Sequence, residues 1–131
     1  MSWLAPDGGL RTLDDALALR PDLLAGYRAL EARLAAELAP QLGSDVRARL
    51  RARIAAVVGV GRRDPGPDDD VLEFAEQLVL DPHGVGEALV ARLSARLGPR
   101  GVVTLAQAVA VWEGRCRLAR ALDVRDDEGG R

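Results

Sequence analysis

The chain has no lysine and no asparagine, a single cysteine (Cys116), a single histidine (His83) and only 3% aromatic residues. One cysteine excludes a disulfide within the chain, and the absence of lysine excludes the Gly-Lys-Ser/Thr ending of a phosphate-binding P-loop. A lone imidazole, which we place on a surface turn, leaves too few ligands for a zinc site and no basis for a serine–histidine pair. We therefore expect no metal and no cofactor.

An excess of basic charge and long apolar runs are also missing. The net charge is -2 and the pI is about 5.4, which argues against the concentrated basic surface of a nucleic-acid-binding protein. No apolar run approaches the roughly 20 residues of a membrane-spanning helix. The start "MSWLAPDGGL" has neither the basic nor the apolar segment of a signal peptide. We expect a soluble, cytoplasmic protein with no nucleic-acid or membrane partner.

Alanine, leucine, arginine and glutamate recur at helical spacing, and proline and glycine punctuate them. The length of 131 residues suits one domain. We predict a single all-α domain over residues 1–131, a bundle of about six helices whose last helix is central and whose polar end, 125–131, is a flexible tail. The expected helices cover about 12–20, 21–39, 44–58, 68–80, 85–97 and 102–122.

Capping and breaking residues mark the helix ends. Thr12, with Asp15 three residues later, resembles a capping box. Pro40 is expected to stop the second helix, Ser44 to cap the third, and the acids at 68–70 to open the fourth. One buried face of the second helix is predicted from the i, i+4, i+7, i+11, i+15 spacing of Leu23, Tyr27, Leu30, Leu34 and Leu38.

The stretch "VGVGRRDPGPDDD", residues 58–70, combines glycines, arginines and aspartates between two helical runs. Its start resembles a dinucleotide fingerprint, but Asp64 stands where the third glycine is needed, and a helix precedes it. Its three final aspartates would point about 100° apart on a helix, which favours capping over cation binding. This stretch is interpreted as a connector.

"LRARIAAVVGVGRR", residues 50–63, resembles the stretch in the carboxymuconolactone decarboxylase and alkylhydroperoxidase D-like family where a helix ends in Gly-Cys-x-x-Cys. Residues 71–124 resemble the family's C-terminal half more closely, and residues 20–34 resemble an upstream helix. The resemblance implies an alkylhydroperoxidase D-like helical bundle. It also implies a homo-oligomer, because family members assemble as dimers, trimers or hexamers.

Redox members of that family use Glu-x11-Cys-x-x-Cys-x3-His, in which a glutamate and a histidine keep the first thiol ionised. If Gly59 matches the family glycine, the four roles fall on Ala48, Val60, Arg63 and Pro67. All four functional side chains are missing, as are the 20 or so residues that usually follow the cysteine pair. The resemblance therefore implies a member that has lost the thiol peroxidase site.

Cys116 does not replace the lost site. Arg115 and Arg117 flank it and could favour a thiolate, but the chain offers no resolving thiol. We interpret Cys116 as a small packing residue.

Three charged residues lie beside apolar helix stripes and are the candidate catalytic residues. Arg53 lies close to the stripe of the third expected helix, and Glu113 and Arg117 lie four residues apart on the sixth. They could form a structural network, with an intrahelical Glu113–Arg117 pair joined by Arg53. They could instead form a pocket in which Arg53 and Arg117 hold a small organic acid and Glu113 moves a proton.

Two classes of function remain open from the sequence. The first, which we favour, is an oligomeric, non-redox binding or accessory module. The second is a cysteine-independent decarboxylase or lactone-acid enzyme that uses Arg53, Glu113 and Arg117. Side chains that converge on a pocket would favour the enzyme, and side chains neutralised by one another would favour the module.

Overall fold

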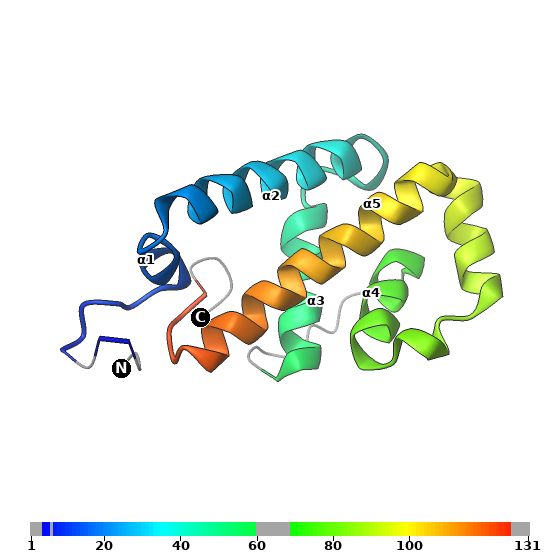
Figure 1. Cartoon of the computed structure of the whole chain (residues 1–131). Coiled ribbons are helices and arrows are strands. Elements are labelled where there is room, and N and C mark those ends of the chain that lie inside the picture. Colours follow the sequence, from blue (N-terminus) through cyan, green and yellow to red (C-terminus); the bar gives the residue numbers. More distant parts are fainter. Residues whose placement is uncertain (1–3, 6, 60–68, 127–131) are drawn as a thin grey trace.

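A computed structural model describes residues 4–5, 7–59 and 69–126 of the protein. Within these ranges the chain is all-helical and has no strand, which confirms the expected fold class. Five α-helices and one 3-10 helix follow one another (Figure 1): α1 Leu13–Leu17, α2 Pro21–Leu42, α3 Val46–Val58, α4 Asp70–Leu80, η1 Pro82–Gly84 and α5 Glu87–Ala121.

The fifth and sixth expected helices are two parts of α5, joined by a sharp bend. Gly98 at the bend has φ 72° and ψ 164°, and Pro99 follows it. Residues other than glycine rarely adopt such a positive φ, so Gly98 permits the bend. The predicted break is therefore present as a bend, and the described residues hold five α-helices instead of six.

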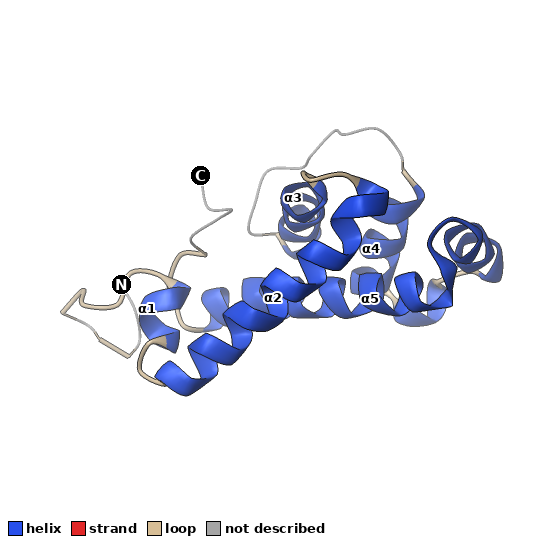
Figure 2. Cartoon of the chain, turned by 90° about the horizontal axis from the view of Figure 1, so that it is seen from above, coloured by secondary structure: helices blue, strands red, loops and turns tan. Residues whose placement is uncertain are grey.

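The segment of α5 after the bend is the centre of the bundle. It crosses beneath α2 in Figure 1, and Figure 2 shows α3 and α4 together on one side of it. Leu105, Val109 and Trp112 of this segment have no exposed surface. Burial of these large side chains against α2, α3 and α4 supplies much of the hydrophobic stabilisation.

The predicted starts of α1 and α4 are confirmed, whereas the predicted cap of α3 and the predicted end of α2 are wrong. Thr12 and Asp15 form a reciprocal capping box, and the Asp69 side chain accepts from the backbone of Val71 at the start of α4. Ser44 does not cap α3, which begins after Asp45. Helix α2 continues through Pro40 to Leu42, because a proline in the last turn removes only one backbone hydrogen bond.

The predicted buried face of α2 is wrong in its first half. Leu34 and Leu38 are buried as expected, but Leu23 is 53% exposed and Leu30 is 41% exposed. Glu31 is buried in their place, at 5% exposure. The cause is tertiary, because this side of α2 meets arginines of α3 and α5.

The segment after α5 runs back beside residues 11–13, at the start of α1. Leu13 donates its backbone N–H to the carbonyl of Arg125 at 2.8 Å, and Arg125 donates to the carbonyl of Arg11 at 2.9 Å. Arg125 and Asp126 were expected to begin a flexible tail, but these bonds and the ion pairs of Asp126 anchor them. The rest of the expected tail, 127–131, lies outside the described residues.

Among the helices described, none combines the length and the apolar character that crossing a membrane requires.

Candidate functional site

Glu113 and Arg117 form the ion pair that their spacing on α5 predicts. Arg117 Nε donates to Glu113 Oε1 at 2.7 Å. The Arg117 side chain is 59% exposed and the Glu113 side chain is 23% exposed, so the pair lies at the surface. Solvent screens such a pair strongly.

Arg53 does not join this pair. Its Nη1 donates to Glu76 Oε2 of α4 at 2.8 Å, and its side chain is only 12% exposed. The three candidate residues thus form two separate ion pairs, and the predicted three-residue cluster is not formed. Sequence spacing placed Arg53 near a buried stripe correctly, but it could not indicate which neighbouring helix supplies the partner.

Arg53, Glu113 and Arg117 line none of three hollows that described residues form. One, of about 460 Å³, lies between the loop before α1 and the segment after α5. It is lined by Gly8, Leu10, Arg11 and residues 123–125. A second, of about 260 Å³, lies between α2 and α5 around Glu37 and Thr104. A third, of only about 10 Å³, lies beside Val46 and Asp69. A pocket built from Arg53, Glu113 and Arg117 is therefore not among these hollows.

Cys116 is buried in α5, at 4% exposure. Burial raises the pKa of the thiol, and the negative charge of Asp126 acts in the same direction. The thiol is therefore protonated at neutral pH, which is the opposite of what a nucleophilic cysteine needs.

The remaining sequence predictions concern loop residues. His83 is exposed in η1, and its backbone N–H donates to the Asp81 side chain. Three of the lost redox positions, Val60, Arg63 and Pro67, fall at 60–68, outside the described residues. Within the described part of the chain, no group of three histidine, cysteine or acidic side chains is arranged to hold a metal ion.

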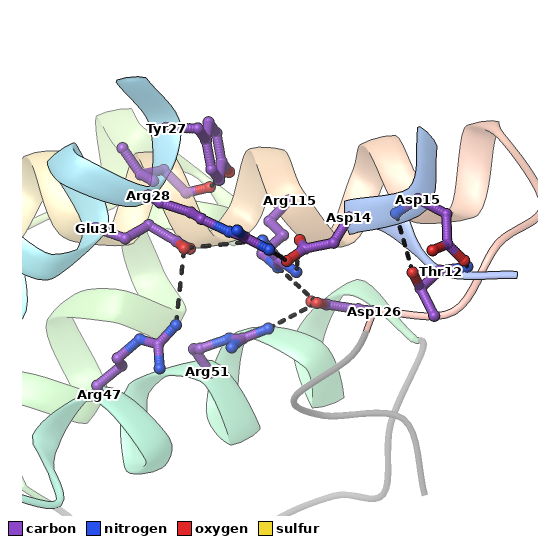
Figure 3. A network of polar contacts seen from close by, with 11 residues as sticks. Thr12, Asp14, Asp15, Tyr27, Arg28, Glu31, Arg47, Arg51, Arg115 and Asp126 are labelled. Atoms are coloured by element: carbon purple, nitrogen blue, oxygen red, sulfur yellow. Dashed lines mark hydrogen bonds and ion pairs between the residues drawn. The ribbon is translucent and has the colours of Figure 1, made fainter. Parts of the chain in front are cut away.

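A buried ionic cluster that sequence reasoning missed lies where α1, α2, α3, α5 and the C-terminal segment meet. We call it the Arg115 network. Figure 3 shows its members pointing toward one another from these separate elements. It comprises Asp14, Glu31, Arg51, Arg115 and Asp126, with Arg28 and Arg47 at its edge.

Arg115 is the centre of the network, with a side chain that is 4% exposed. Its Nε donates to Asp126 Oδ1 at 2.6 Å, and its Nη2 donates to Asp14 Oδ1 at 2.8 Å. Its Nη1 lies 3.7 Å from Glu31 Oε2. The planar guanidinium can bind carboxylates in several directions at once, so one side chain holds three elements to α5.

Further arginines meet the same carboxylates. Arg51 Nη2 of α3 donates to Asp126 Oδ1 at 2.7 Å, and Arg28 Nη2 donates to Asp14 Oδ2 at 2.8 Å. Arg47 Nη2 lies 3.7 Å from Glu31 Oε2. The three acids thus each meet two arginines, which offsets the desolvation of the buried charges.

The protonation states follow from these contacts. Burial opposes ionisation of Asp126, but hydrogen bonds from Arg51 and Arg115 outweigh it and lower its pKa. The pKa of Asp14 is lowered against burial in the same way, by Arg28 and Arg115. Acids held ionised in this manner are weak bases at neutral pH, so the network is suited to holding elements together and not to proton transfer.

Tyr27 borders the network and stays neutral. Burial and the negative charge of Glu31 raise its pKa to about 12. Its hydroxyl donates to the backbone carbonyl of Val111 at 2.9 Å, which joins α2 to α5.

The sequence held one signal for this network. Ala108, Trp112, Arg115 and Ala119 follow i, i+4, i+7, i+11, so Arg115 falls on the most buried face of α5. A buried arginine requires carboxylate partners. The partners Asp14 and Asp126 come from the two ends of the chain, however, and no local spacing connects them.

Comparison of the chain with protein-family models, with curated proteins and with solved structures finds no match.

Proposed function

We propose that the protein is a non-redox binding or accessory module with an alkylhydroperoxidase D-like fold, and that it works as a homo-oligomer in the cytoplasm. The observation that carries this proposal is the pairing of the two candidate arginines within the chain. Arg53 is neutralised by Glu76 and Arg117 by Glu113. Each guanidinium therefore already has a carboxylate partner within the chain.

The family assignment rests on the resemblance of residues 50–63 and 71–124, and an all-helical chain agrees with it. Loss of the redox function is supported by the missing Cys-x-x-Cys motif and by the buried thiol of Cys116. Burial keeps the thiol protonated, and the chain has no second cysteine to act as a resolving partner.

The alternative, a lactone-acid enzyme, needs Arg53, Glu113 and Arg117 to converge on one substrate. Their division into two ion pairs with different partners favours the module.

A peroxide-consumption assay tests the non-redox assignment. We expect the purified protein, supplied with a dithiol reductant, to consume organic hydroperoxide no faster than buffer does. Consumption above buffer that Cys116→Ser abolishes would overturn the assignment, because it would move Cys116 from packing to catalysis.

A further inference from the structure

The largest of the three hollows described above lies between the loop before α1 and the segment after α5. Its volume is about 460 Å³, and the half-buried side chains of Leu10 and Val124 line it. Sites for small molecules in proteins have volumes of roughly 300 to 1,000 Å³. The hollow is therefore large enough for a small organic ligand that has an apolar part.

Two arginines, Arg11 and Arg125, also line this hollow, and both are exposed. Every other arginine in the described part of the chain has a partner, because each meets a carboxylate except Arg120, which donates to the backbone carbonyl of Val58. Among these residues, only the side chains of Arg11 and Arg125 meet neither a carboxylate nor a carbonyl. The hollow thus has two positive charges that no ion pair neutralises.

The backbone holds both arginines in place without using their side chains. Arg125 donates its backbone N–H to the carbonyl of Arg11 at 2.9 Å, and its own carbonyl accepts from Leu13 at 2.8 Å. The backbone N–H of Arg11 donates to Asp15 Oδ2 at 3.0 Å. The fold therefore fixes where the two side chains start, while both guanidiniums keep all of their hydrogen-bond donors for a ligand.

We propose that this hollow binds a small organic phosphate, with the phosphate at Arg11 and Arg125 and the organic group against Leu10 and Val124. A phosphate monoester carries a charge of about -1.5 to -2 at neutral pH and has three acceptor oxygens, so it can neutralise two guanidiniums. A single carboxylate carries half that charge. This inference rests on the proposed binding module and gives it a class of ligand.

Asp123 lines the same hollow and gives the test a second direction. Its negative charge opposes the binding of an anion, so Asp123→Asn should strengthen the affinity for a phosphate. The backbone of Asp123 has φ 53°, a conformation that asparagine adopts more readily than most residues. The substitution therefore removes the charge and keeps the backbone conformation.

An NMR titration of the full chain with phenyl phosphate, at constant ionic strength, tests the site. We expect the amide signals of Leu10 and Val124 to shift. Arg11→Gln and Arg125→Gln should each weaken the affinity about tenfold or more, because each removes a charge-assisted hydrogen bond while the backbone bonds remain. Arg92→Gln makes the same charge change at an exposed arginine that is paired with Asp70, and this matched control should leave the affinity unchanged.

Three outcomes would overturn the proposal. Equal weakening by Arg92→Gln would indicate unspecific attraction of anions to surface arginines, and succinate that binds as tightly as phenyl phosphate would contradict the phosphate class. Amide signals of Leu10 and Val124 that do not move at millimolar phenyl phosphate would exclude the site. The non-redox assignment would survive each of these results, because the peroxide-consumption assay tests it separately.

Discussion

Arg115 Nε and Asp126 Oδ1 lie 2.6 Å apart in a buried ion pair that ties the C-terminal segment to the central helix. The same carboxylate oxygen accepts from Arg51 of α3 at 2.7 Å. Backbone hydrogen bonds between residues 11–13 and Arg125 hold the segment beside the start of α1. Asp126 is therefore a structural residue that anchors the C-terminal segment to α3 and α5, while Arg125 joins the same segment to the residues before α1.

Asp126→Asn should strongly destabilise the fold. The substitution removes the negative charge that neutralises two buried guanidiniums, and breaking a buried pair in this way costs about 3 kcal/mol or more. Urea denaturation followed by circular dichroism measures the change. Asp22→Asn, which removes the exposed partner of Arg20, is the control and should change the midpoint little. Equal, small changes in unfolding free energy for the two substitutions would contradict a stabilising role for Asp126.

The contribution of Asp126 should depend on pH. Its pKa is lowered in the folded state relative to about 3.9 in the unfolded chain, so the ionised form stabilises the fold fully above that value. This stability is lost as the pH falls through the lowered pKa. The difference in unfolding free energy between the wild type and Asp126→Asn should therefore be constant near neutral pH and shrink below about pH 4. A difference that grows on acidification would contradict this assignment.

Local chemistry explains which parts of the fold could be predicted from the sequence. The Thr12–Asp15 capping box and the bend at Gly98 depend on residues a few positions apart, and both are present. The exposure of Leu23 and the burial of Glu31 depend on α3 and α5, which the local spacing of α2 does not report.

The candidate site was less predictable for the same reason. The Glu113–Arg117 pair lies within one helix turn and was expected, whereas Arg53 pairs with a residue 23 positions away. Asp126 follows a helix in a charged, glycine-containing stretch, which is typical of a tail. Only the return of this segment to α1 makes it part of the core.

Cys116 should react slowly with thiol reagents in the folded protein. Its side chain is buried and its pKa is raised, so both access and thiolate are limited. Labelling with a chromogenic disulfide should be slow under native conditions and become fast in denaturant. Rapid stoichiometric labelling of the native protein would show that the thiol is accessible.

Glu113→Ala should have a small effect on stability. Its partner Arg117 is 59% exposed, and an i, i+4 pair at the surface contributes under about 1 kcal/mol. Thermal or urea unfolding measures the change, with Arg117→Ala expected to match it. A loss of about 3 kcal/mol would instead indicate a buried role for Glu113.

A thermal-shift screen of small dicarboxylates and lactone acids tests most directly whether Arg53, Glu113 and Arg117 are structural ion pairs or a site. A ligand that binds the folded state raises the melting temperature, by an amount that grows with the logarithm of its concentration relative to its Kd. The wild type, Arg53→Ala, Glu113→Ala and Arg117→Ala are compared with each acid, and Arg92→Ala, an exposed arginine paired with Asp70, is the matched control. We predict no acid-specific shift in any of them. Stabilisation of the wild type by one acid that vanishes in both Arg53→Ala and Arg117→Ala, but persists in Arg92→Ala, would contradict the module and establish a carboxylate site.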